Sequence, residues 1–133
     1  MECLIGLVLS LAVAGLASSV GFDRDRVYYP VLLIVIATYY VLFASMGASG
    51  RVVILESTLA AGFVLIAVIG FKSNLWVVVA ALASHGVFDF VHQRFIENPG
   101  VPRWWPGFCL AFDAMAGGFL AVLLVRRKNW SAN

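Results

Sequence analysis

Hydrophobic residues form five long runs along the chain, separated by short polar segments. The runs cover about residues 3–20, 27–47, 52–71, 75–96 and 107–125. Each is close to the roughly 20 residues that an α-helix needs to cross the hydrocarbon core of a bilayer. The separating segments hold most of the charges and the turn-forming residues. The pattern predicts an all-α fold, an integral membrane bundle of five transmembrane helices, with residues 1–133 as a single transmembrane domain.

The composition agrees with a membrane protein and excludes several soluble classes. Of the 133 residues, 62% are hydrophobic and 12% are charged, which is too apolar for a typical soluble domain. The formal net charge of +2 comes without a basic stripe or interleaved aromatic residues, so we expect no nucleic-acid partner. The sequence has no phosphate-binding Gly-rich loop, no Gly-x-Ser-x-Gly motif and no haem-attachment motif. The expected surroundings are therefore the lipid bilayer, with an oligomer or a larger membrane complex left open.

The first run allows two interpretations. Residues 3–20 resemble a signal peptide, because small residues lie near a candidate cleavage point. The preceding residues, Met-Glu-Cys, carry an acid and no Lys or Arg, which favours a retained helix.

The basic residues predict the orientation of the bundle in the membrane. Lys and Arg are more frequent beside the cytoplasmic ends of membrane spans. Six basic residues fall on one side and three on the other: Arg24, Arg26, Lys72, Arg126, Arg127 and Lys128 against Arg51, Arg94 and Arg103. This difference predicts an N-terminus outside and a cytoplasmic C-terminus in the plasma membrane.

Three acidic residues fall inside the predicted spans at a similar depth. With a rise of 1.5 Å per residue, Glu56, Asp89 and Asp113 lie within roughly 6 to 12 Å of the same membrane surface, the predicted outer one. An ionisable group inside a span costs about 3 kcal/mol or more and usually faces the bundle interior. Small residues at 60–62 and 117–118 should allow these helices to approach closely. We therefore expect a shared polar pocket.

The residue types in this pocket predict a metal centre. His85, Asp89 and His92 are spaced i, i+4 and i+7, so they share one helix face. Imidazole and carboxylate groups are the ligands of zinc, iron and manganese. We expect a divalent metal, zinc before iron or manganese, held by His85, Asp89, His92 and Asp113, with Glu56 as a ligand or as the general base that acts on metal-bound water. Such a site suits a metal-dependent hydrolase or oxidoreductase that acts on a lipid-like substrate.

Two other interpretations of the same residues remain open. The polar groups could form only a helix-packing network in a non-catalytic membrane subunit or assembly protein. Asp89 would then pair with a histidine, Arg94 or Arg51, and Asp113 would accept a hydrogen bond from Tyr39 or Tyr40. The third interpretation is a proton or solute conduit, although the inner halves of the spans are nearly all apolar.

The segment "ENPGVPRWWPGFC" at 97–109 has two interpretations. Trp104 and Trp105 suit an interfacial anchor, while the three prolines suit a rigid lid over the pocket. Cys3 and Cys109 each begin a predicted span at the outer level. They could form a disulfide if their helices adjoin, Cys109 could ligate metal, or both could be ordinary thiols. Tyrosines at 28, 29, 39 and 40 are expected to serve in packing and at the membrane interface.

The stretches "HGVFDFVH" and "NPGVPRWWPGFCLAFD" resemble a family of small bacterial integral-membrane proteins of unassigned function. The resemblance covers about the last third of the chain and implies a bacterial inner-membrane location but no activity. A remote similarity is to the alkaline-ceramidase-like membrane hydrolases, whose zinc site uses three histidines with a nearby Asp and Ser. This chain offers Ser84, His85, Asp89 and His92 but only two histidines and five predicted spans, so a carboxylate would have to replace the third imidazole.

Overall fold

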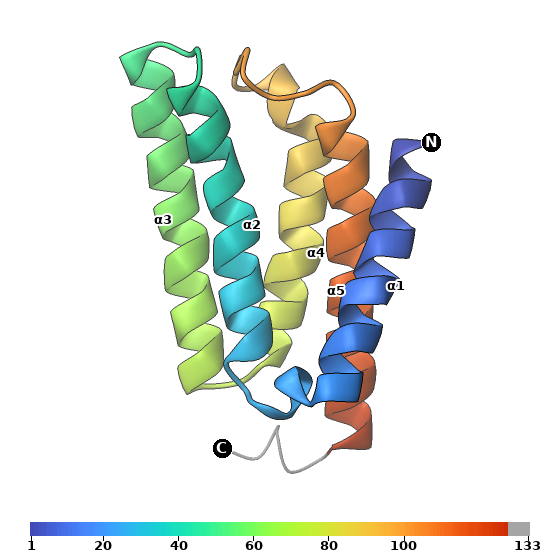
Figure 1. Ribbon diagram of the computed structural model, residues 1–133. Helices are drawn as coiled ribbons and strands as arrows, with labels where there is room; N and C mark the ends of the chain where they lie inside the picture. Colours follow the sequence, from blue (N-terminus) through green and yellow to red (C-terminus); the bar gives the residue numbers. More distant parts are fainter. Residues whose placement is uncertain (128–133) are drawn as a thin grey trace.

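The structure, a computed structural model, describes residues 1–127 as a bundle of five α-helices with no strand in that range. The helices run up and down in succession (Figure 1). Two short 3-10 turns, η1 (Phe22–Arg24) and η2 (His92–Arg94), follow the first and fourth helices. The helices are α1 (Glu2–Val20), α2 (Tyr28–Ser45), α3 (Gly50–Lys72), α4 (Trp76–Val91) and α5 (Trp105–Arg126). The all-α prediction with five helices is confirmed for the described residues.

Local sequence signals explain where most helices begin and end. Gly21 ends α1 with φ 88°, a left-handed conformation that glycine adopts without strain, and its N–H bonds to Ala17 O. The Ser49 side chain caps α3 by accepting a hydrogen bond from Val52 N. Proline in the first turn of α5 costs nothing because the N–H groups there have no helical partner.

The fourth helix is shorter than the sequence predicts. The apolar run at 75–96 suggested one continuous span, but α4 ends at Val91 and continues as the 3-10 turn η2. The side chains of His92 and Gln93 bond to partners outside the helix, namely Glu56 and Asn98. These tertiary contacts explain the tighter turn at this end.

The central position belongs to α4, which contacts α2, α3 and α5. Helix α1 packs on α5, and α2 packs on α3, so two helix pairs lie on either side of α4 (Figure 1). The buried apolar core includes Leu33, Leu82 and Leu120, one from each of α2, α4 and α5. Because α4 meets three other helices, its polar residues can reach partners from all of them.

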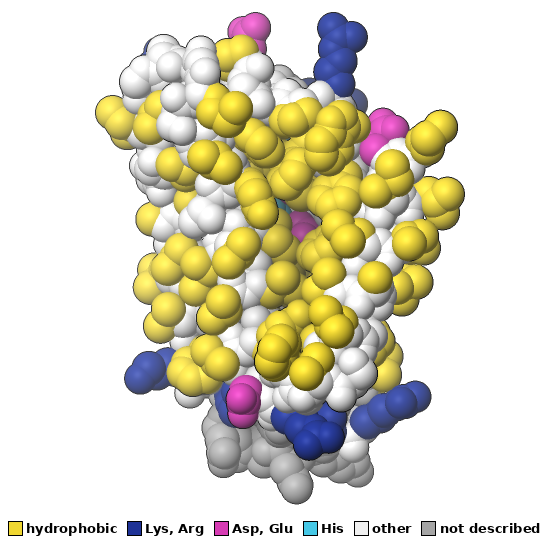
Figure 2. Space-filling view, in the orientation of Figure 1, with side chains coloured by type: hydrophobic (Ala, Val, Ile, Leu, Met, Phe, Trp, Pro, Cys, Tyr) yellow, Lys and Arg dark blue, Asp and Glu magenta, His cyan; other side chains and the backbone are white. Residues whose placement is uncertain are grey.

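The outer surface is apolar between two charged ends. Large side chains such as Leu16, Ile54 and Val125 are exposed, and Figure 2 shows hydrophobic side chains over the middle of the visible face with Lys and Arg near the ends. Four helices, α1, α2, α3 and α5, are long and apolar enough to cross a membrane. The 16 residues of α4 are too few by the same length criterion.

Candidate metal centre

Three buried side chains from α4 and α5 form a group that could hold a metal ion. His85, Asp89 and Asp113 each offer a ligand atom, and these atoms lie within 4.8 Å of one another. His85 Nδ1 lies 2.7 Å from Asp113 Oδ2 and 3.5 Å from Asp89 Oδ2. We call these three residues the ligand cluster. Imidazole and carboxylate are donor types that bind zinc, iron and manganese.

Close contact between α4 and α5 brings the ligand cluster together. A Cβ atom placed on Gly86 would lie 3.1 Å from Asp113 Cβ and 3.4 Å from Leu110 Cα, so glycine permits this approach. Gly117 serves similarly lower in the bundle, where a Cβ would lie 3.4 Å from Leu82 Cβ. Gly62 and Gly118 were expected from the sequence to frame the pocket, but a Cβ atom placed on either would meet no other helix within 4 Å. The helix contact that positions Asp113 therefore depends on Gly86, next to His85 in the chain.

The carboxylates of the ligand cluster have unused hydrogen-bonding capacity. Asp89 is fully buried, and neither of its oxygens has a hydrogen-bond partner. Asp113 uses Oδ2 for His85, but its Oδ1 has no partner. The Tyr40 hydroxyl and the Cys109 thiol are the polar neighbours of Asp89 from α2 and α5. Buried carboxylate oxygens without partners are costly, and a cation would compensate them.

The other two predicted site residues belong to a neighbouring cluster. His92 Nε2 lies 2.8 Å from Glu56 Oε1, and the Asn98 side-chain amide donates to the same oxygen at 2.9 Å. We call Glu56, His92 and Asn98 the link cluster. The structure therefore places the five predicted residues in two groups: His85, Asp89 and Asp113 lie together, while Glu56 and His92 face each other. Tyr40 packs against the His92 ring at a centroid distance of 4.2 Å.

Asn98 is a site residue that sequence reasoning missed. It lies in the segment between α4 and α5 and is almost completely buried. Besides bonding to Glu56, its amide donates to Tyr40 O at 3.2 Å, and its Oδ1 accepts from Gly100 N at 3.2 Å. These bonds fasten the segment to α2 and α3. An asparagine before proline at a helix exit was the available signal, but it resembles an ordinary turn residue.

In the Trp104–Trp105 pair and in the Cys3–Cys109 pair, the first residue is exposed and the second is buried. Trp104 is half exposed, as an anchor would be, whereas Trp105 is buried against Tyr39 and Phe43. Cys3 is exposed and Cys109 is buried, and both are free. Cys3 lies beside the Gly107 position of α5, whereas Cys109 faces α2 and Asp89. The two thiols therefore occupy different sides of α5 and form no disulfide.

The alternative partners suggested for the acids can also be placed. Asp89 pairs with His85, and Asp113 accepts its hydrogen bond from His85. The Tyr40 hydroxyl is buried without a hydrogen-bond partner, so it does not donate to Asp113. The polar residues of α4 thus interact mainly with each other and with α3 and α5.

Comparison with known proteins adds no assignment to this geometry. No family model matches the chain, and no match was found among curated proteins or solved structures. The similarity to small bacterial membrane proteins therefore stays a prediction from sequence motifs, and the site has to be interpreted from its own chemistry.

Proposed function

We propose that the protein is an integral membrane protein that binds one divalent metal ion between α4 and α5, through His85, Asp89 and Asp113. The observation that carries this proposal is Asp89, a fully buried carboxylate with no hydrogen bond to either oxygen. Two carboxylates and one imidazole within 4.8 Å supply suitable donors. Zinc is the first candidate, with manganese and iron as the alternatives.

We propose that all five helices span the membrane, so that α4 is added to the four that meet the length criterion. The 16 residues of α4 cover about 24 Å, and the following 3-10 turn adds about 6 Å, which together match a hydrocarbon core of about 30 Å. The basic residues in the described part divide between the two ends as five and three: Arg24, Arg26, Lys72, Arg126 and Arg127 against Arg51, Arg94 and Arg103. Lys128, also counted in the sequence analysis, lies outside the described residues. This distribution supports a cytoplasmic C-terminus. The bacterial inner membrane as the location rests on the sequence resemblance alone.

The reaction we propose is hydrolysis of an ester or amide in a lipid-like substrate. Water adds to the carbonyl carbon, the bond to the alcohol or amine breaks, and the leaving group takes up a proton, giving a carboxylic acid and the alcohol or amine. A divalent metal supplies carbonyl polarisation and an activated water at neutral pH. The carboxylate oxygens of Asp89 and Asp113 that have no hydrogen-bond partner are free to act as ligands of this metal.

Glu56 is proposed to act through His92 and not on water directly. Its Oε1 is already shared by His92 Nε2 and the Asn98 amide. This contact fixes the orientation of the imidazole. His92 Nδ1 is buried without a partner, and His92 is an electrostatic neighbour of Asp89. His92 is therefore our candidate for the group that accepts the proton from water.

A metal-free packing network is the second candidate. It is favoured by two short histidine contacts, 2.7 Å from His85 to Asp113 and 2.8 Å from His92 to Glu56, which pair both imidazoles without a metal. A proton or solute conduit has less support. The core is filled by fully buried apolar side chains such as Leu33, Leu82 and Leu120, which offer no polar path.

Metal analysis by plasma mass spectrometry on the detergent-purified full chain separates the two candidates. We expect about one zinc, manganese or iron per chain in the wild type and a loss of at least tenfold in Asp89→Asn, which removes a charged ligand and keeps the side-chain shape. Asp23→Asn is the matched control, since Asp23 is an equally buried acid in η1, at the opposite end of the bundle. A wild type that holds no metal after incubation with all three ions overturns the metal proposal in favour of the packing network.

A further inference from the structure

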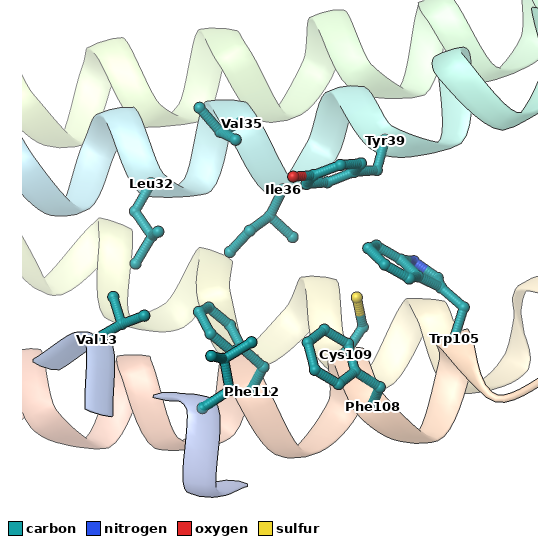
Figure 3. A pocket seen from close by; sticks show the side chains of 10 residues that line it. Val13, Leu32, Val35, Ile36, Tyr39, Trp105, Phe108, Cys109 and Phe112 are labelled. Carbon is teal, nitrogen blue, oxygen red and sulfur yellow. The ribbon is translucent and has the colours of Figure 1, made fainter. Parts of the chain in front are cut away.

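An open groove lies between α1 and α2, where these two helices pack on different neighbours. Helix α1 packs on α5 and α2 packs on α3, so α5 forms the floor between them. The groove has a volume of about 280 Å³. Figure 3 shows its walls, with Val13 on α1, Leu32 and Ile36 on α2, and Phe112 on α5. Most of its length is apolar.

One end of the groove is polar and meets the ligand cluster. Cys109 lines the groove and is a neighbour of Asp89. Trp105 lines the same end, and its buried indole N–H has no hydrogen-bond partner. In Figure 2, an acidic side chain and a histidine can be seen deep between the hydrophobic side chains, where α4 lies behind α2 and α5 in Figure 1. The groove therefore combines a long apolar part with an end that carries polar groups, among them the unpaired Trp105 N–H.

The lining of the groove suits a hydrocarbon chain. From Leu32 to Tyr39 the groove follows α2 for about 10 Å. The walls are apolar over this length and belong to the surface on which large hydrophobic side chains are exposed, so the surrounding lipid chains can reach them. A hydrocarbon chain fits the narrow apolar part, and a carbonyl oxygen fits a lone N–H donor at its end. A second copy of the chain would need to bring a helix into this space.

We propose that the groove binds one acyl chain of a lipid ester or amide, with its carbonyl at the Trp105 end beside Asp89. This inference rests on the proposed function, because it names the substrate class of that site. Trp105 donates a hydrogen bond to the carbonyl oxygen, and the apolar walls on α1 and α2 hold the chain. The groove opens toward the surrounding lipid, so the substrate enters from within the bilayer.

Photo-crosslinking in phosphatidylcholine vesicles tests the acyl-chain site with the full chain. The probe is a phosphatidylcholine that carries a diazirine in the middle of one acyl chain, and peptide mass spectrometry locates the adducts. We expect adducts near Ile36 and Phe112 in at least fivefold excess over adducts near Leu65, an exposed residue on α3. Equal labelling at both places overturns the proposal.

Groove-filling variants provide the matched comparison. Val35→Trp and Leu9→Trp each place a large ring in the groove from a side chain that is about half exposed, so their effect on folding is small. Both should lower groove labelling about tenfold, whereas Leu65→Trp should not change it. Unchanged labelling in both groove variants overturns the proposal. A dimer in native mass spectrometry that is lost in Val35→Trp, with no groove labelling, would assign the groove to a second copy instead.

Two further measurements separate this site from the metal proposal. Asp89→Asn should lose metal but keep groove labelling. Groove labelling therefore tests the acyl-chain site even if the metal proposal fails. An ether-linked probe lacks the carbonyl. In the wild type, we expect the ester probe to label the groove about fivefold more than the ether probe, and in Trp105→Phe we expect the two probes to label it equally. An equal response to both probes in the wild type contradicts the placement of the carbonyl at Trp105.

Discussion

Two histidine–carboxylate clusters lie close together in the bundle and differ in how fully their polar atoms are used. In the link cluster, Glu56 Oε1 is bonded to both His92 and Asn98, and one side-chain atom, His92 Nδ1, lacks a partner. In the ligand cluster, both oxygens of Asp89 and one oxygen of Asp113 have no hydrogen bond. Burial is similar in the two clusters, so the difference is one of partners and not of depth.

The difference indicates separate tasks for the two clusters. A buried polar group that has its partners helps to fix the arrangement of helices and loops. A buried carboxylate without partners costs free energy unless something binds it. The link cluster therefore holds the segment between α4 and α5 in place and orients His92, while the ligand cluster is left available for a cation.

The largest expected effect is the response of stability to metal. At a metal concentration one hundred times the Kd, binding should raise the free energy of unfolding by about 2.7 kcal/mol. The measurement is unfolding in mixed detergent and dodecyl sulfate micelles, followed by tryptophan fluorescence with and without a chelator. Asp89→Asn should show no metal response, while Glu56→Gln should keep most of it. If both variants lose the response equally, the two clusters form one site.

A second test compares the two acids in metal-free protein. Glu56→Gln should lower the free energy of unfolding by about 1 to 2 kcal/mol, because the charged carboxylate that accepts two hydrogen bonds becomes a neutral amide, a weaker acceptor. Asp89→Asn should leave stability unchanged or raise it by up to about 1 kcal/mol, because it removes a buried acid with no hydrogen bond. The same unfolding assay, with chelator present throughout, checks both. A loss of more than about 1 kcal/mol in Asp89→Asn contradicts the comparison.

The contrast between the clusters also shows how far the sequence could predict the structure. Hydropathy predicted α3 as residues 52–71, and the structure has Gly50–Lys72, because an apolar run of spanning length has few alternatives to a helix. Helix order then placed the acids at one level. Sequence spacing could not show the rotation of each helix about its axis, which decides whether Glu56 of α3 meets His92 or His85. That rotation follows from packing details such as the close approach at Gly86.

Loop residues were harder to predict for a different reason. The sequence indicated a rigid segment at 97–109 from its prolines and tryptophans, but nothing distinguished Asn98 from other turn-forming residues. Its role depends on Tyr40 O and Glu56, which are 58 and 42 positions away in the chain. Contacts of this kind appear only when the helices are packed.

A third test measures how Asn98 contributes to the link cluster. Asn98→Ala should cost about 1 kcal/mol in the unfolding assay, since it removes the amide that bonds to Glu56 and Tyr40. In a double-mutant cycle with Glu56→Gln, we expect a coupling of about 0.6 kcal/mol, the average for hydrogen bonds inside membranes. Asn74→Ala, in the exposed link between α3 and α4, is the control and should show no coupling with Glu56. Additive behaviour of Asn98 and Glu56 would remove Asn98 from the cluster.

The smallest expected effect concerns the close contact between α4 and α5 at Gly86, on which the ligand cluster depends and the link cluster does not. In Gly86→Ala the new methyl would lie 3.1 Å from Asp113 Cβ, so α5 must shift by a few tenths of an ångström. The cost should be about 1 kcal/mol or less, and the metal Kd, measured by competition with a chelator, should rise about threefold to fivefold. Gly62→Ala is the matched control, because no atom lies within 4 Å of the added Cβ and the helix preference of alanine favours the change.

Because Gly86 contacts α5 and not the Glu56 side chain, its substitution should leave the Glu56–Asn98 coupling unchanged. Weaker metal binding together with an intact link cluster would show that the two groups are separable, whereas an unchanged Kd in Gly86→Ala would mean that the approach of α4 to α5 does not position Asp113.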